Sequence, residues 1–245
     1  MKTFYALCLM LLPFLSFSQT ANDYINKGVE AHNQQNFKTA IGYYTKAIGV
    51  DAKSLLAYSN RATAYYSLKA YKEAIADCNK LLALDANNHT GNYLLGITYK
   101  EQNKYPKAIE HLTAAMAAKP TDANTIYNRA WAYWESMDHK KALVDMKKLV
   151  EVAPKKAEYH YWCGKWKQEV GQEEYKTAIK DYTKAIELDD KYVEAYVERG
   201  AYYMTQGNFK AALKDLTTAK KIDPSVEVDH YIEAAKFELE MQEGN

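Results

Sequence analysis

A motif of 34 residues recurs through most of this chain, and it limits the fold more than any other feature. The copy at residues 55–88 reads LLAYSNRATAYYSLKAYKEAIADCNKLLALDANN. Apolar and small residues recur there at helical spacing in two blocks, the second containing Ala74, Cys78 and Leu81. A short turn at residues 67–70 separates the blocks. Neither helix can bury its apolar side alone, so we expect an antiparallel hairpin that the next hairpin covers.

Six copies of the motif share small residues at fixed positions. With Ala62 as the eighth position of its copy, the eighth positions are Gly28, Ala62, Gly96, Ala130, Gly164 and Gly200. The twentieth positions are Ala40, Ala74, Ala108, Ala142, Ala178 and Ala212. The positions predicted to open each second helix are Phe37, Tyr71, Tyr105, His139, Tyr175 and Phe209. Small residues at fixed positions are typical of places where two helix axes cross closely.

Three copies also end in a proline, which stops a helix: Pro120, Pro154 and Pro224. With these prolines and the fixed positions above, the chain resembles the tetratricopeptide repeat family over residues 21–226. The resemblance implies an all-α, right-handed α-solenoid of six helix-turn-helix hairpins, at residues 21–54, 55–88, 89–122, 123–156, 157–192 and 193–226. Two features depart from the family pattern. Lys167 stands where the family prefers tyrosine or a small residue, and two extra residues lie within 172–174.

Residues 227–242 are predicted to form a capping helix that covers the open end of the solenoid. Its apolar stripe of Ala234, Phe237 and Met241 is expected to face the sixth hairpin, with charged residues on the opposite side. No linker separates the repeats, so residues 19–245 are interpreted as one solenoid domain.

The first 18 residues have the pattern of a cleaved secretory signal. Lys2 precedes an apolar run at residues 4–15, and Ser16 and Ser18 place small residues before the predicted cleavage point, which would leave Gln19 first. The run is too short to anchor the chain across a bilayer, and Cys8 lies too early for lipidation. The ending resembles signals of Bacteroidota-type bacteria, so we predict export to the periplasm or cell surface. A buried N-terminal helix is the alternative.

The net charge of the predicted mature chain excludes some classes of partner. Removal of residues 1–18 would leave 31 basic and 31 acidic residues, which argues against nucleic acid as a partner and against electrostatic membrane binding.

The two remaining cysteines, Cys78 and Cys163, occupy core positions in non-adjacent repeats. We interpret them as buried thiols that are too far apart for a disulfide, with an intermolecular disulfide as the alternative.

Arginine and aspartate recur together in the even repeats. The arginines lie at the seventh position and the aspartates at the twenty-third, giving Arg61 with Asp77, Arg129 with Asp145, and Arg199 with Asp215. The pattern favours a salt bridge inside each hairpin over an anion-binding ladder, because each arginine has its own aspartate. Repeats that clamp the C-terminal carboxylate of cytosolic chaperones need further polar residues. The matching positions here are Ile25, Val29, Thr90 and Leu94, so only Asn60 agrees with that clamp.

The concave face is the predicted binding surface. In the family this face is lined by the second, fifth, ninth, twelfth and thirteenth positions of each first helix. Here they supply a ligand-binding groove of Tyr66, Tyr93, Tyr127, Trp131, Trp134 and Tyr161. Apolar area is added by Ile25, Val29, Leu56 and Ile97, and polar points by Lys100, Glu135, Lys165 and Glu169. Large aromatic rings on a concavity are typical of binding hot spots. Alternatively, some of the rings fill gaps between neighbouring first helices.

The sequence contains no metal-binding, phosphate-binding or nucleophile motif, and no cofactor is predicted. The repeats occupy nearly all of the predicted mature chain, so we expect a protein that is not an enzyme. We predict a protein–protein interaction scaffold that binds a peptide or one helix of a partner in the groove. The alternative is a structural subunit of an envelope assembly that uses its convex faces or ends.

Overall fold

The computed structural model describes residues 19–243, and these form helices without any strand. The helices are α1 (Ala21–Asn33), α2 (Phe37–Val50), α3 (Leu55–Ser67), α4 (Tyr71–Leu84), α5 (His89–Glu101), α6 (Tyr105–Ala118), α7 (Ala123–Glu135), α8 (His139–Val152), α9 (Ala157–Val170), α10 (Gln172–Leu188), α11 (Val193–Thr205), α12 (Phe209–Ile222) and α13 (Asp229–Glu243). The predicted all-α repeat solenoid is confirmed. The predicted signal at residues 1–18 lies outside the described residues.

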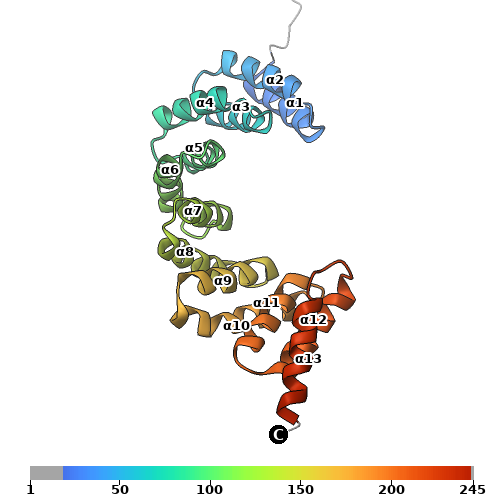
Figure 1. Cartoon of the computed structure of the whole chain (residues 1–245). Helices are drawn as coiled ribbons and strands as arrows, with labels where there is room; N and C mark the ends of the chain where they lie inside the picture. Colours follow the sequence, from blue (N-terminus) through green and yellow to red (C-terminus); the bar gives the residue numbers. More distant parts are fainter. Residues whose placement is uncertain (1–18, 244–245) are drawn as a thin grey trace, which may run out of the picture.

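The helices stack in chain order into a C-shaped array (Figure 1). Each helix packs on the next one in sequence, and the first helices of neighbouring hairpins also touch. In the middle of the array α5, α7 and α9 lie on the inner side of the curve, while α6, α8 and α10 lie on its outer side (Figure 1). The first helices therefore form the wall of the concave surface.

Local sequence signals determine where the helices begin and where the hairpins turn. Thr20 and Asp23 form a reciprocal capping box at the start of α1, and Asp122 accepts a hydrogen bond from the Thr125 backbone at the start of α7. The fifteenth residue of five repeats adopts positive φ in the turn, namely Gln35, Lys69, Asn103, Met137 and Gly207. A short left-handed turn ends each of these first helices and allows the second to fold back.

Glycine at the eighth position of four hairpins makes room for a large side chain that faces it across the hairpin. A Cβ atom added to Gly164 would lie 2.7 Å from the Tyr182 ring, and one added to Gly96 would lie 2.5 Å from Leu112. Where the eighth residue is Ala62 instead, it packs in one core cluster with the smaller Cys78. Glycine is thus required opposite the tyrosine and leucine side chains, whereas Ala130 packs in one cluster with the unbranched Met146.

The even hairpins contain the predicted salt bridges. Arg129 donates from Nε and Nη2 to the two carboxylate oxygens of Asp145, each at 2.7 Å, and Asp145 is only 2% exposed. Arg129 also donates from Nη1 to Thr113 of the preceding hairpin at 3.2 Å. Arg61 and Arg199 repeat both contacts, each with the aspartate of its own hairpin and with a threonine of the preceding one, Thr45 or Thr183. All three guanidinium groups are thus bound by side chains of the protein itself. The prediction of salt bridges inside the even hairpins is confirmed.

The fifth hairpin differs from its neighbours in the way that the two sequence departures suggested. The second helix α10 begins at Gln172 rather than at the predicted Tyr175, because the extra residues add a turn to this helix after Gly171. Lys167 donates to Asp181 at 2.7 Å, and both side chains are 12% exposed. Lys167 therefore gives this hairpin an ion pair with the aspartate at the twenty-third position, although the cation comes from the eleventh position and not from the seventh.

The prediction for the capping helix was wrong about which face is buried. Ile232 and Ala235 of α13 are buried, together with Val228 before it, whereas Phe237 is 60% and Met241 54% exposed. Residues 228, 232 and 235 have helical spacing of four and three, so they form a stripe beside the predicted one. Val228 and Ile232 pack in one core cluster with Leu216 of α12, and the Lys220 ammonium group adds hydrogen bonds to the Val226 carbonyl and to the Asp229 carboxylate at the start of α13.

Both described cysteines are free and buried, as predicted. Burial raises the pKa of the Cys78 thiol and that of the Cys163 thiol to about 12. Both thiols therefore stay protonated at neutral pH and act as small apolar core residues.

Candidate ligand-binding groove

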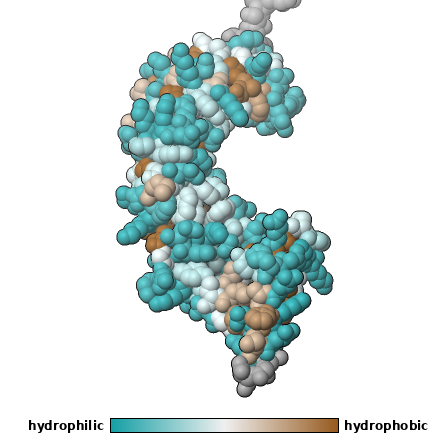
Figure 2. Space-filling model, viewed as in Figure 1, coloured by the Kyte–Doolittle hydropathy of each residue, from teal (hydrophilic) through white to brown (hydrophobic). Residues whose placement is uncertain are grey.

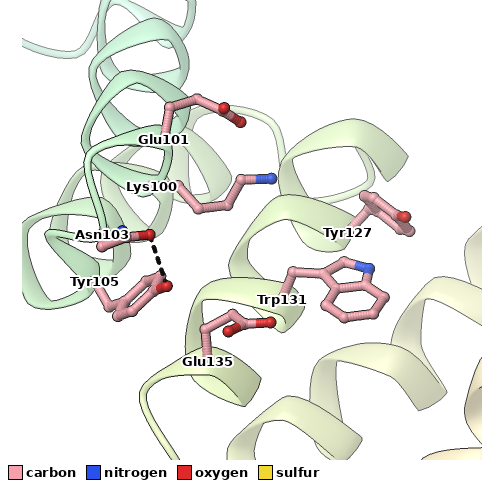
Figure 3. A pocket seen from close by; sticks show the side chains of 7 residues that line it. All are labelled: Lys100, Glu101, Asn103, Tyr105, Tyr127, Trp131 and Glu135. Atoms are coloured by element: carbon pink, nitrogen blue, oxygen red, sulfur yellow. Dashed lines mark hydrogen bonds between the residues drawn. The ribbon is translucent and has the colours of Figure 1, made fainter.

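The concave wall is hollowed between the third and fourth hairpins. A pocket of about 280 Å³ opens there, and Figure 3 shows the side chains that line it: Lys100, Glu101, Asn103, Tyr105, Tyr127, Trp131 and Glu135. Lys100 and Glu101 come from the end of α5, whereas Tyr127, Trp131 and Glu135 follow one another at spacings of four along α7. The helical repeat therefore places two rings and a carboxylate on one strip of the inner wall.

The polar groups of this pocket are held by a short hydrogen-bond chain. Lys100 donates from Nζ to the side-chain oxygen of Asn128 at 2.7 Å, and Asn128 donates to the Tyr93 hydroxyl at 3.4 Å. Burial lowers the pKa of Lys100, and the nearby carboxylates of Glu101 and Glu135 oppose this shift. The contacts anchor the ammonium group of Lys100 against α7 and leave the two carboxylates at the pocket edge.

The tryptophans of the fourth hairpin also pack against the fifth. Trp131 meets Trp162 and Trp166 edge to face, with ring centroids 5.0 and 5.1 Å apart, and Trp134 stacks on Trp166 at 4.6 Å. On its other side Trp134 stacks on His139 at 4.3 Å. Trp131 thus has one part in the core and one part at the pocket, while Trp134 mainly fills the space between helices.

Sequence reasoning did not identify Trp162 and Trp166 as part of this aromatic cluster. Trp166 occupies the tenth position of its repeat, where the second, third and fourth repeats have the fully buried Ala64, Thr98 and Ala132. A large ring at a position that is small in the three preceding repeats was the available signal. The ring requires covering surface, and Trp131 and Trp134 of the preceding hairpin provide it.

The other predicted groove residues have separate environments. Tyr66 and Tyr93 are half-buried and pack on the core of the second and third hairpins. Tyr161 is 8% exposed, and burial raises its pKa and that of Tyr66 to about 12. Of the predicted apolar residues, Ile25 and Ile97 are buried, whereas Val29 and Leu56 are exposed. The structure therefore brings Tyr127 and Trp131 together at one pocket and places Tyr161 at another.

That second pocket lies between the fifth and sixth hairpins. It has a volume of about 300 Å³ and is lined by Tyr161, Lys191, Val193, Glu194, Val197, Glu198, Asp223 and Val226. The predicted polar residue Lys165 forms an ion pair there with Glu198. Figure 2 shows the inner side of the curve as pale and teal surface, without a broad brown patch in the middle of the array. Aromatic rings and polar groups thus characterise the first pocket, whereas the second combines one ring and charged groups with three valines.

The described residues contain no cluster of three or more histidine, cysteine, aspartate or glutamate side chains that could hold a metal ion. Within the same part of the chain, no helix combines the length and the apolar character needed to cross a bilayer.

Comparisons with known proteins agree on the repeat architecture. Family models described as "Tetratricopeptide repeat" match residues 25–89, 93–157 and 193–226, and one described as "TPR repeat" matches residues 167–207. The chain is 25% identical over 204 residues to Hsp70-Hsp90 organizing protein 3 of Arabidopsis thaliana, covering 81% of this chain and 36% of that protein. It is 28% identical over 211 residues to the Hsp70-Hsp90 organizing protein of Triticum aestivum, covering 81% and 34%. The chain spans about a third of the length of these relatives.

Solved structures with the same fold include YrrB, described as a TPR protein with an unusual peptide-binding site. It is 24% identical, with a TM-score of 0.66, and the match covers 74% of this chain and 93% of that one. PilF of Pseudomonas aeruginosa is 17% identical, with a TM-score of 0.69, and the match covers 84% and 93%. At these identities the likeness establishes a common architecture.

Proposed function

The chain belongs to the tetratricopeptide repeat family, which has a protein-interaction fold, and from this premise we propose that it is a scaffold whose concave groove holds a peptide or one helix of a partner protein. The observation that supports the groove is the pocket formed by Tyr127 and Trp131 on the inner wall. A partner side chain inserted there would be desolvated on several sides, which is the condition for a binding hot spot. The proposal includes no catalytic role and no cofactor.

We do not propose a chaperone as the partner, although the plant relatives are named for Hsp70 and Hsp90. The family's carboxylate clamp for chaperone tails needs polar side chains at positions that hold Ile25, Val29, Thr90 and Leu94 here. Ile25 is 3% and Leu94 4% exposed, so two of these positions contribute to the core instead. We therefore propose a different protein partner.

Capture of the native partner by purified variants tests the groove. Tyr127→Ala should weaken capture by at least about tenfold, because a hot-spot ring contributes roughly 2 kcal/mol. Trp131→Ala with Tyr93→Ala should abolish capture, although Trp131 also covers Trp166 and this variant is expected to melt earlier. Val144→Ala is the matched control, because Val144 is 65% exposed on α8, outside the concave wall. Full capture by both groove variants would refute groove binding.

We also propose that the chain is exported, to the periplasm or the cell surface of a bacterium. The supporting pattern is Lys2, the apolar run and the small residues before Gln19. N-terminal sequencing of the native protein should begin at or within a few residues of Gln19. An intact Met1 on protein purified from the cell envelope would contradict export.

A second candidate function is self-assembly as a structural subunit through the end of the solenoid. The observation that favours it is the exposed apolar stripe of α13, where Phe237 is 60% and Met241, one turn further on, 54% exposed. Light scattering at several concentrations would then show association that Phe237→Glu removes. A monomer at every concentration would exclude this candidate and leave the groove proposal unaffected.

A further inference from the structure

The two pockets of the concave wall share an unusual combination of groups. The first places three rings, and the second Tyr161 with three valines, beside more carboxylates than ammonium groups, although Glu198 of the second is paired with Lys165. The first has Glu101 and Glu135 against Lys100, and the second has three acidic side chains against Lys191. The pocket at the N-terminal end is different, because it is lined by Val29, His32, Asn33, Tyr44, Asn60 and Thr63, without a carboxylate. The acidic and aromatic character is therefore a property of the third to sixth hairpins.

In the first pocket two carboxylates without partners among the described residues face one ammonium group, which keeps its charge while it donates a hydrogen bond. The ammonium group of Lys100 is bound by Asn128 at 2.7 Å. Glu101 and Glu135 are exposed, and within the described part of the chain neither takes part in a hydrogen bond or a close ion pair. Figure 3 shows Glu101 above and Glu135 below the Lys100 ammonium group, with Trp131 and Tyr127 on one side and Tyr105 on the other. A ligand in this pocket therefore meets ring faces and two carboxylates.

These groups suit a flat cation. A guanidinium group stacks on an aromatic ring through cation–π attraction and donates two parallel hydrogen bonds to a carboxylate. A pocket of about 280 Å³ has room for one such side chain. A carboxylate ligand would meet Glu101 and Glu135 and would have only Lys100 in its favour, which is already hydrogen-bonded.

We propose that the pocket between α5 and α7 binds an arginine side chain of the partner segment held in the groove, with Trp131 and Tyr127 contacting the guanidinium group and Glu135 and Glu101 pairing with its charge. The proposal rests on the groove function above and specifies its ligand. The second pocket, with its carboxylates and Tyr161, extends the same preference along the wall towards a segment that contains more than one basic residue.

A set of three capped peptides tests this directly. Each has seven residues, with alanine and serine around a central arginine, citrulline or glutamate. Citrulline keeps the shape of arginine and lacks its charge. Binding is measured by the shift of the Trp131 indole N–H resonance in a titration. The arginine peptide should bind on the order of tenfold more tightly than the citrulline peptide, and rising salt should reduce this difference.

Variants of the exposed carboxylates complete the test without disturbing the core. Glu135→Gln with Glu101→Gln should remove the preference for arginine over citrulline. Glu110→Gln, an exposed glutamate on α6 outside the pocket, should keep it. Equal binding of arginine and citrulline, tighter binding of the glutamate peptide, or no binding of the arginine peptide would each overturn the inference. If capture of the native partner still depends on Tyr127 in those cases, the groove function stands and only the arginine assignment fails.

Discussion

The second, fourth and sixth hairpins contain a two-pronged Arg–Asp salt bridge, called the fork below, that the first, third and fifth lack. All six hairpins nevertheless have the same helix-turn-helix backbone. In the even hairpins an arginine at the seventh position binds both oxygens of an aspartate at the twenty-third. In the odd hairpins these two positions hold Lys27 with Tyr43, Leu95 with His111, and Cys163 with Asp181. The odd hairpins use glycine at the eighth position instead, against Tyr44, Leu112 or Tyr182.

The comparison teaches that close helix packing in this solenoid has two physical sources. Where a guanidinium group neutralises a buried carboxylate, the hairpin depends on electrostatics and hydrogen bonds. Where glycine lets a ring or a leucine reach the opposite backbone, it depends on steric fit. The sixth hairpin combines both, because Gly200 faces Leu216 in addition to the fork of Arg199. Substitutions that remove the arginine should therefore affect the even hairpins, and substitutions of the glycine should affect the odd hairpins and the sixth.

The largest expected effect follows from breaking a fork. Arg129→Met should lower the free energy of unfolding by about 3 kcal/mol, because Asp145 would stay buried without a partner. Arg129→Met with Asp145→Leu should recover much of this loss, since no charge is then left unpaired. Urea denaturation of the two single variants and the double variant measures the coupling. Lys141→Met is the control, because its pair with Asp138 is exposed and should matter little. Additive losses in the cycle would show that the fork is not a functional pair.

A change at the eighth position of an odd hairpin should have the next largest effect. Gly164→Ala places a Cβ atom 2.7 Å from the Tyr182 ring, so overpacking should lower the stability by about 1–3 kcal/mol. Gly42→Ala, on α2, meets nothing within 4 Å and should raise the stability by up to about 1 kcal/mol through better helix propensity. Thermal melting of both variants checks the opposite signs. A stabilised Gly164→Ala variant would show that the odd hairpins do not depend on close contact.

Acid should weaken the third hairpin, because a histidine stands where the even hairpins have aspartate. Burial holds the pKa of His111 below its ordinary value of 6.5, so the folded state favours the neutral ring. Its contribution is complete above pH 6.5 and is lost as the pH falls through the lower folded pKa. Urea midpoints from pH 8 to pH 5 should fall less steeply for His111→Gln than for the wild type. Identical slopes would mean that protonation of this ring costs no stability.

The repeated pattern made the fold predictable, while the details of the groove depended on exceptions to it. The period, the small residues and the Arg–Asp pairs each follow from local spacing, so the hairpins and the three forks could be derived. The exposure of the aromatic rings could not, because it depends on Trp166, which stands where the three preceding repeats have a small residue and which is covered by the fourth repeat.

The capping helix was misjudged for a related reason. Its sequence offers two apolar stripes, and the choice between them depends on packing against Leu216 in another helix. The sequence of one helix shows which of its faces are apolar enough to be buried. It does not show which of them packs against the neighbouring helix.

The smallest expected effect concerns the link between an odd hairpin and the even one that follows. Thr113 on α6 accepts from Nη1 of Arg129 at 3.2 Å across this boundary. Thr113→Val keeps the shape and removes the acceptor, so the stability should fall by about 0.5–1 kcal/mol. Thr217 is the matched control, because it has the same position in the sixth repeat, and its hydroxyl donates to the Leu213 carbonyl of its own helix. If Thr113→Val costs no more than Thr217→Val in urea denaturation, the arginine fork acts within its own hairpin only. A larger cost that disappears in the Arg129→Met background would show that the fork also joins neighbouring hairpins.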